Sequence, residues 1–275
     1  MRIRNSLLVA TFSAALSICG IARADLTGMT KLDGKAPEPE VIDMSAVGDC
    51  AKLHPDPVTK EDIVADDKGN LANVVVAIKK EDSPDLAAGN VPNEPATIDQ
   101  NGCMYKPHVL AMMVGQEFHI KNTDGFLHNI HTLSTVNPSF NKAQPTKVDE
   151  KVDPLKAPEN FHVKCDVHPW MSAYIAVFDH PYFAVSDASG KFAIKNLPDG
   201  DYTVTAWHEK LGTQEQKVSV KGGKGEVNFT FKPEGAMAPD TKNVILASDK
   251  GAEKSDCPAC CAGASKAASV AAAKK

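Results

Sequence analysis

The chain has 275 residues, of which 24% are charged and 43% hydrophobic, and a formal charge of −5 at neutral pH. This length suffices for one large or two small domains with a buried core. The acidic balance argues against nucleic acid and anionic membranes as partners, and it is compatible with docking to a basic protein. Eighteen prolines, eighteen glycines and few helical patterns predict an all-β fold.

Residues 1–24 have the features of a secretory signal peptide. Arg2 and Arg4 precede an apolar run over residues 6–21, and alanines at 22 and 24 precede Asp25. The run is shorter than most membrane spans, and no second apolar stretch is long enough for one. We therefore expect a periplasmic or secreted protein without a transmembrane segment. Its mature chain would carry 27 basic and 35 acidic side chains, a formal charge of −8.

The following segments predict strands separated by loops. Residues 25–61, with several prolines at turns, and the polar residues 81–95 and 134–160 are expected to be irregular. Segments with the β-branched and apolar residues of buried strands are 71–79, 105–113, 117–122 and 174–178.

A second unit is expected over residues 181–232. Its four short strand candidates are 191–194, 202–207, 214–220 and 226–231. The unit is too small to bury much surface alone, so we expect it to form one rigid body with the preceding domain. The residues expected near this junction are His180, Tyr182, Phe183, Trp207 and His208. The tail, residues 233–275, is rich in Ala, Lys and Ser and is predicted to be disordered.

The segment FHVKCDVHPWM, residues 161–171, carries the chemistry. Cys165, His168 and Met171 follow one another with two residues between each pair. Zinc sites seldom use a thioether, whereas Cys with two His and a weak axial Met is the ligand set of blue-copper electron-transfer sites. The second imidazole is available in His128, which follows a predicted strand. Asn129 beside it is placed to tie the two ligand loops together by backbone hydrogen bonds.

Two motifs in this order resemble the cupredoxin family. Residues 105–107, 114–116, 122–124 and 128–129 resemble the middle of a cupredoxin domain, and residues 165–171 resemble the short ligand loop of amicyanins. The resemblance implies a Greek-key β-sandwich over residues 25–180 that holds one type 1 copper ion. Its equatorial ligands would be His128, Cys165 and His168, and its axial ligand would be Met171.

The second unit resembles a different family. Residues 189–192, 197–200 and 202–204 resemble carboxypeptidase regulatory-like, or transthyretin-like, β-domains. This resemblance implies a small antiparallel β-sandwich appended to the first domain, and it implies no activity. The combination resembles methylamine-utilisation-like and plastocyanin-like proteins of bacterial periplasms.

The remaining cysteines leave alternatives open. In an exported protein Cys165 is first read as a disulfide partner of Cys50 or Cys103. If Cys165 binds copper, Cys50 and Cys103 are expected to form a disulfide, or else a second metal site with His54 or His108. In the tail, Cys257, Cys260 and Cys261 are compatible with Cu(I) binding, a local disulfide or a link between two chains.

The sequence favours one-electron transfer to a redox partner protein rather than an enzyme. His168 is the expected exposed ligand through which the electron leaves, with Pro169, Trp170 and Phe126 as an apolar docking face. One alternative is a copper carrier or reservoir without a redox partner. A copper enzyme would need a second cluster of histidines, and the nine histidines show none along the sequence. A purely structural β-domain would hold Cys165 in a disulfide.

Overall fold

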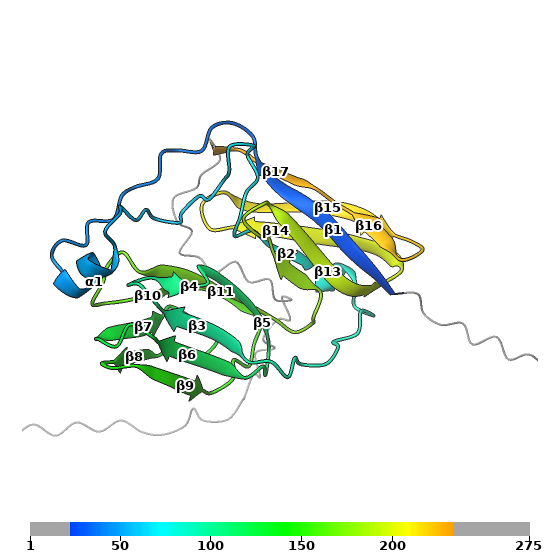
Figure 1. Ribbon diagram of the computed structural model, residues 1–275. Coiled ribbons are helices and arrows are strands. Elements are labelled where there is room, and N and C mark those ends of the chain that lie inside the picture. Colours follow the sequence, from blue (N-terminus) through cyan, green and yellow to red (C-terminus); the bar gives the residue numbers. More distant parts are fainter. Residues whose placement is uncertain (1–22, 234–275) are drawn as a thin grey trace, which may run out of the picture.

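The computed structural model describes residues 23–233, which form two β-sandwiches side by side (Figure 1). The predicted all-β fold is confirmed. The predicted signal peptide, apart from its last two residues, and the tail with its three cysteines lie outside the described residues. No helix within residues 23–233 is long and apolar enough to cross a membrane.

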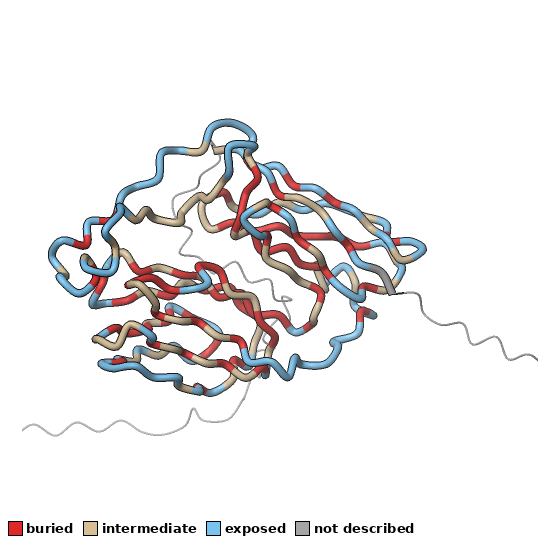
Figure 2. Tube along the Cα trace, in the orientation of Figure 1, coloured by how far each residue is buried: buried red, intermediate tan, exposed pale blue. Residues whose placement is uncertain are grey.

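The first sandwich consists of a five-stranded sheet, in the order β5-β11-β10-β7-β8, and a four-stranded sheet, in the order β4-β3-β6-β9. Its strands are β3 (Ala96–Gln100), β4 (Tyr105–Lys106), β5 (Val109–Met113), β6 (Phe118–Asn122), β7 (His128–Thr132), β8 (Asn141–Gln144), β9 (Val148–Val152), β10 (Glu159–Lys164) and β11 (Ser172–Phe178). Alternate side chains point inward from both sheets, among them Ile98, Phe118, Val163 and Ile175, none of which is exposed. Figure 2 shows this buried layer between the sheets.

The second sandwich packs the sheet β12-β2-β14-β15 against a sheet in which β1 lies between β13 and both β16 and β17. Its strands are β1 (Arg23–Leu32), β2 (Val75–Ile78), β12 (Phe183–Val185), β13 (Lys191–Pro198), β14 (Gly200–His208), β15 (Gly212–Val220), β16 (Lys224–Glu226) and β17 (Phe229–Phe231). Leu26, Ile194, Val204 and Phe229 are fully buried between the sheets. Three of the strands predicted after residue 181 are present as β13, β14 and β15, whereas the fourth, over residues 226–231, is divided between β16 and β17.

The boundary between the two units differs from the one predicted from the sequence. Residues 25–61, expected to be irregular, contain β1 and the short helix α1 (Gly48–Leu53). β1 pairs antiparallel with β13 and parallel with β16 and β17, whereas β2 pairs with β12 and β14. Both strands therefore belong to the second sandwich and not to a first domain over residues 25–180. Pairing partners so far apart leave no local sequence signal, and the parallel pairs mean that this sandwich is not purely antiparallel.

The polar stretch over residues 134–160 also contains strands. β8 and β9 lie in it, and both have mostly exposed side chains, so they lack an apolar alternation.

The loop before β8 is organised by Glu159, a buried carboxylate that accepts hydrogen bonds from Ser134 Oγ (2.5 Å) and from the backbone N–H of Asn137 (3.0 Å). Burial opposes the charge of Glu159, but these hydrogen bonds lower its pKa.

The two sandwiches share a small apolar cluster at their junction. Tyr174 of β11 meets Trp207 of β14 edge to face at 5.4 Å between ring centroids, and Phe178 stacks on Phe183 at 4.6 Å. Of the residues expected at the junction, Phe183 and Trp207 therefore contact the first sandwich, and His180 packs against Phe178. The other two lie within the second sandwich, where Tyr182 joins the buried cluster and His208 packs against Phe231.

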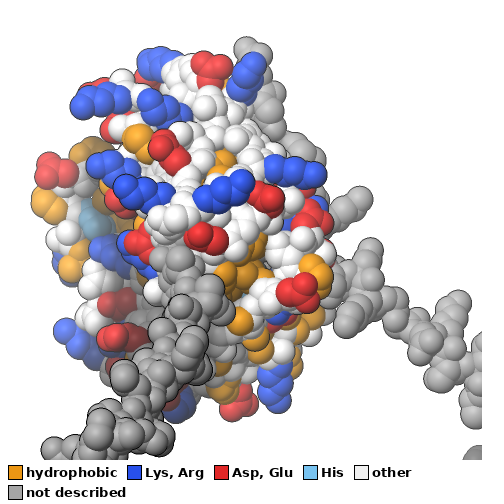
Figure 3. Space-filling view, turned by 90° about the vertical axis from the view of Figure 1, so that its right-hand side faces the viewer, with side chains coloured by type: hydrophobic (Ala, Val, Ile, Leu, Met, Phe, Trp, Pro, Cys, Tyr) orange, Lys and Arg blue, Asp and Glu red, His pale blue; other side chains and the backbone are white. Residues whose placement is uncertain are grey.

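Charges of both signs cover the end of the molecule that is on the right in Figure 1. Figure 3 shows this face, with lysine or arginine and acidic side chains interspersed over it. In the second sandwich, which forms this end, Lys195 pairs with Asp25 at 2.7 Å. The drawn face therefore has a mixed rather than a single-signed charge.

Candidate metal centre

The first sandwich brings His128 and Cys165 together at one end. His128 is the first residue of β7, and Cys165 directly follows β10. β7 runs antiparallel to β10, with Lys164 opposite His131, so the start of one strand lies beside the end of the other. Residues 165–171, the ligand loop, connect β10 to its neighbour β11. Two backbone bonds close this loop, from Cys165 N–H to the Met171 carbonyl (3.3 Å) and from Met171 N–H to the His168 carbonyl (2.9 Å).

Three potential ligand atoms converge inside this end of the sandwich. The Nδ1 atoms of His128 and His168 are 2.9 Å apart, and Cys165 Sγ lies 3.7 Å from His168 Nδ1. All three side chains offer atoms within 4.8 Å of one another, and no residue of the three is more than 2% exposed. Two nitrogens and one soft sulfur, buried together, fit the donor preference of copper.

Met171 lies in the same buried cluster as Cys165 and is fully buried. Its side chain and that of Cys165 also line one pocket. The structure thus places Met171 beside Cys165 and, through its backbone bond, beside His168, and its role as an axial ligand stays a prediction.

Asp124 orients the first imidazole. Its Oδ2 atom lies 2.8 Å from His128 Nε2, and its two carboxylate oxygens also accept the backbone N–H groups of Gly102 (2.6 Å) and Cys103 (2.8 Å). When Nε2–H donates to this carboxylate, the lone pair is on Nδ1, which faces His168 and Cys165. We did not predict this role from the sequence. The available signal was an acid four residues before the histidine, in the turn after β6.

Asn129 connects the two ligand-bearing segments, as predicted. Its Oδ1 accepts the backbone N–H groups of Asp166 (2.7 Å) and Val167 (3.3 Å) and lies 3.2 Å from Cys165 Sγ. Its Nδ2 donates to Asn141 of β8 (2.6 Å). The amide is buried, so these bonds fix the ligand loop against β7 and β8.

Burial keeps both imidazoles neutral near pH 7. It is the main cause that lowers the pKa of His168 to about 4, with the nearby His128 as a second cause. Burial likewise lowers the pKa of His128, although Asp124 opposes the shift. Neutral imidazole is the form that binds a metal ion, so neither ring needs to lose a proton first.

A disulfide covers the outer side of the ligand loop. Cys50 of α1 is bonded to Cys103, as predicted, and the described part of the chain leaves Cys165 as its free cysteine. Around the disulfide lies a buried apolar group, the disulfide cluster, formed by Ile42, Met44, Cys50, Cys103 and Met104. The sulfurs of Cys50 and Cys103 lie within 4.8 Å of a ring nitrogen of His168.

This cover corrects the expected docking face. His168 was predicted to be the exposed ligand, yet it is only 2% exposed. Phe126 and Trp170 are half-buried against the disulfide cluster, and Trp170 Nε1–H donates to the Cys103 carbonyl (3.0 Å). The difference arises because residues 33–66 leave the second sandwich, reach the far end of the first one and place α1 there (Figure 1).

Histidines outside the converging group have other contacts. His54 Nε2 lies 2.7 Å from the Gly102 carbonyl, and His131 Nδ1 lies 3.0 Å from Asp166 at the surface. His108 forms a buried hydrogen-bonded pair with Glu209, which links the two sandwiches. Because Cys50 and Cys103 are bonded to each other, the alternative of a metal site formed by these cysteines with His54 or His108 is wrong.

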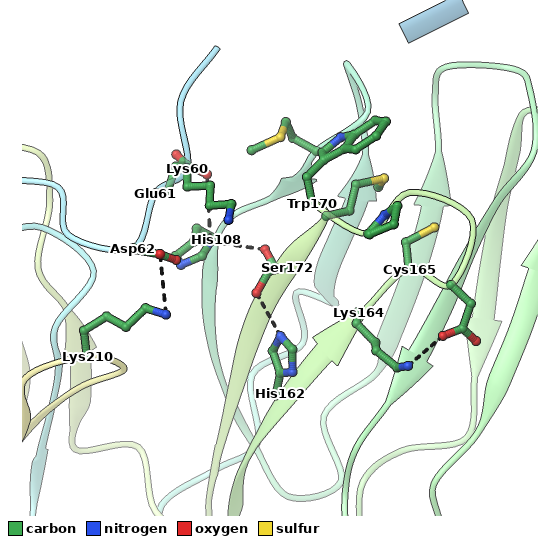
Figure 4. A pocket seen from close by; sticks show the side chains of 14 residues that line it. Lys60, Glu61, Asp62, His108, His162, Lys164, Cys165, Trp170, Ser172 and Lys210 are labelled. Atoms are coloured by element: carbon green, nitrogen blue, oxygen red, sulfur yellow. Dashed lines mark hydrogen bonds and ion pairs between the residues drawn. The ribbon is translucent and has the colours of Figure 1, made fainter. Parts of the chain in front are cut away.

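A pocket of about 410 Å³, the junction pocket, opens beside the ligand loop. Figure 4 shows His108 and His162 on opposite sides of Ser172, with Trp170 and Cys165 farther along the wall. His162 Nε2 lies 2.8 Å from Ser172 Oγ. Lysine and acidic side chains, such as the paired Lys210 and Asp62, add charges of both signs. The pocket thus reaches from solvent to the wall formed by the ligand loop.

Sequence comparison matches one family model. The model of domain II of polysaccharide lyase family 4 matches residues 170–227, which extend from the ligand loop to the strands of the second sandwich. This family is different from the carboxypeptidase regulatory-like domains that residues 181–232 resemble, and that resemblance stays a prediction. No curated protein matches the chain.

Solved structures of cupredoxins are similar to part of the chain. The copper nitrite reductase of Thermus scotoductus SA-01 is 22% identical, with a TM-score of 0.29 over 31% of this chain and 22% of the reductase. An amicyanin variant in the Cu(I) state is 20% identical, with a TM-score of 0.28 over 34% of this chain and 90% of amicyanin. A purple cupredoxin from Nitrosopumilus maritimus is 21% identical, with a TM-score of 0.26 over 30% of this chain and 99% of its own. The chain therefore spans less than a quarter of the reductase.

Proposed function

We propose that this protein holds one type 1 copper ion and exchanges single electrons with a redox partner protein. The observation that carries the proposal is the convergence of His128 Nδ1, His168 Nδ1 and Cys165 Sγ in a buried site. Cys165 has no cysteine partner among residues 23–233, so a soft sulfur donor is available there. The predicted signal peptide supports a periplasmic or secreted location, which is part of the same proposal.

The residues around the site act by holding the ligands still. When bound, copper would supply the one-electron redox couple Cu(II)/Cu(I). Asp124 fixes the ring of His128, and Asn129 fixes the ligand loop, so both states would meet nearly the same set of donors. Met171 would act as a weak axial ligand that tunes the reduction potential. Burial of all four side chains excludes water from the donors.

The alternative is a copper carrier or reservoir. A carrier must release its metal to another molecule, which favours exposed and mobile ligands. Here His128, Cys165 and His168 are buried, and hydrogen bonds from Asp124 and Asn129 hold His128 and the ligand loop in place, which favours retention of the metal and hence electron transfer. We also propose that the protein is not itself an enzyme, because the same burial keeps a substrate away from the metal.

Protein-film voltammetry with a chelator challenge separates the two functions. For electron transfer we expect a reversible one-electron wave, and copper should stay bound while a Cu(I) chelator is present in both oxidation states. Rapid loss of Cu(I) to the chelator, with an irreversible wave, would instead indicate a carrier. A matched control is Asp149→Asn, which changes an exposed acid of β9 paired with His119 and should keep both the reversible wave and the bound copper.

A further inference from the structure

The covered position of His168 leaves the route of the electron to be found, and the inference below rests on the proposed function. The imidazole is 2% exposed, and the Cys50–Cys103 disulfide lies against it. A partner on the surface therefore cannot touch this ring. Because electron tunnelling weakens steeply with the gap between groups, some side chain has to bridge His168 and the surface.

Trp170 is placed to be that bridge. Its indole lies 5.3 Å from the His168 imidazole between ring centroids, at an interplanar angle of 47°. The ring is half-buried and lines the junction pocket together with Cys165 and Met171. In Figure 4 Trp170 lies on the pocket wall above His108. One face of the indole is thus near a candidate ligand, and the pocket gives access to it from solvent.

The hydrogen bond of the indole keeps this geometry. Trp170 Nε1–H donates to the carbonyl of Cys103 at 3.0 Å, and the disulfide holds Cys103 to α1. The ring also packs against the disulfide cluster. An indole held at both its polar and its apolar edges occupies one orientation relative to His168, as a bridge between two redox groups requires.

The competing route passes through Phe126. That ring lies 5.0 Å from the His128 imidazole and is also half-buried against the disulfide cluster. Unlike Trp170, it does not line the junction pocket. Benzene is also a poorer bridge than indole, because its filled π orbitals are lower in energy. Position and chemistry both favour Trp170.

We propose that Trp170 carries the electronic coupling between His168 and a redox protein that docks at the mouth of the junction pocket. In each exchange Cu(I) loses one electron and becomes Cu(II), while the oxidised group of the partner gains that electron. The indole is neither oxidised nor deprotonated, since the electron tunnels through its orbitals. No bond forms or breaks, and the Nε1–H bond to Cys103 is kept.

The first test compares electron exchange in variants at the two aromatic rings. We expect Trp170→Leu to keep the visible band and the reduction potential but to slow electron self-exchange, measured by NMR line broadening, by an order of magnitude or more. Trp170→Phe should recover part of the rate. Phe126→Leu, the matched control, should exchange at close to the wild-type rate. Equal rates in wild type and Trp170→Leu, or an equal loss in Phe126→Leu, would overturn the proposal.

A second test leaves Trp170 in place and is independent of turnover. The chain has two tryptophans, so Trp207→Phe leaves Trp170 as the single tryptophan, which can be excited selectively. Bound Cu(II) can accept an electron from the excited indole, whereas Zn(II) of the same charge cannot. We expect Cu(II) to shorten the emission lifetime of Trp170 by an order of magnitude and Zn(II) to change it little. Equal lifetimes with both metals would overturn the proposal. A protein that binds Cu(II) without a thiolate band would overturn the proposed function instead.

Discussion

The imidazoles of His128 and His168 face each other through their Nδ1 atoms at 2.9 Å, although the residues lie on different elements of the first sandwich. A carboxylate behind His128 and a disulfide behind His168 hold this arrangement from outside. Two neutral nitrogens beside a free thiol are donors that one metal ion can join.

Asp124→Asn should weaken copper binding. The change removes the negative charge that accepts His128 Nε2–H and two backbone N–H groups. Loss of such a supporting carboxylate typically lowers metal affinity by about 10- to 100-fold. Competition with a calibrated chelator measures the affinity. The control is Asp149→Asn, an exposed acid of β9 that pairs with His119, which should leave copper affinity unchanged. Equal affinity in wild type and Asp124→Asn would contradict the role given to this carboxylate.

Asn129→Ala should destabilise even the copper-free protein. The substitution leaves the part-buried backbone N–H groups of Asp166 and Val167, within the ligand loop, without their acceptor. We expect the free energy of unfolding to fall by about 1 kcal/mol, the low end of the cost of leaving a donor unsatisfied, because water can reach these two residues. Denaturant titration of the copper-free form measures this. An unchanged free energy of unfolding would show that water replaces the amide without loss.

Met171→Leu should separate ligation from packing. The two side chains have similar volume, so the substitution in this fully buried position should cost less than about 1.5 kcal/mol of stability. As an axial ligand, Met171 should affect the reduction potential more than metal retention. The variant should keep copper and have a higher potential, because an apolar surrounding disfavours Cu(II). An unchanged potential in voltammetry would place Met171 outside the coordination sphere.

Two buried histidines, His180 at the junction and His208 in the second sandwich, should make stability depend on pH. Burial lowers the pKa of His180 and of His208 to about 4, and each Nδ1 accepts a backbone N–H, from Tyr182 (3.1 Å) and from Lys210 (3.2 Å). In the unfolded chain both titrate near 6.5. The unfolded state therefore binds more protons below that pH, and the free energy of unfolding falls as the pH drops from about 6.5 to about 4.

The double variant His180→Asn/His208→Asn measures this contribution. An amide oxygen can accept the same backbone N–H groups but does not titrate in this range. At about 1.4 kcal/mol per pKa unit, each histidine accounts for a loss of up to about 3 kcal/mol in the free energy of unfolding as the pH falls to 4. The variant should thus lose less stability than wild type between pH 6.5 and 4, by denaturant titration. Parallel pH profiles for the two proteins would contradict the assignment.

The ligand loop could be predicted from the sequence because its chemistry is local. Cys165, His168 and Met171 share a spacing that few other sites use, and the turn before His128 has a recognisable pattern. The cover over His168 could not be predicted in the same way. It depends on Cys50 reaching Cys103 across 53 residues, and no short-range pattern encodes where α1 comes to lie.

The domain boundary was predicted wrongly for a related reason. β1 lacks a strong apolar alternation, and it becomes a strand by pairing with β13, β16 and β17 near the other end of the described chain. Edge strands β8 and β9 escaped prediction because most of their side chains face solvent. Long-range pairing and exposed edges are the two situations in which tertiary contacts, rather than local composition, decide the structure.

The most direct test of a copper–thiolate site is the optical and electron-spin-resonance spectrum of the Cu(II)-loaded full chain, compared with that of Cys165→Ser. We expect wild type to show an intense visible charge-transfer band and a small copper hyperfine splitting, because thiolate sulfur is the strongly coupled ligand. Cys165→Ser should lose the band even where it still binds Cu(II). A colourless wild-type protein with stoichiometric Cu(II), or a band that survives in Cys165→Ser, would contradict the account.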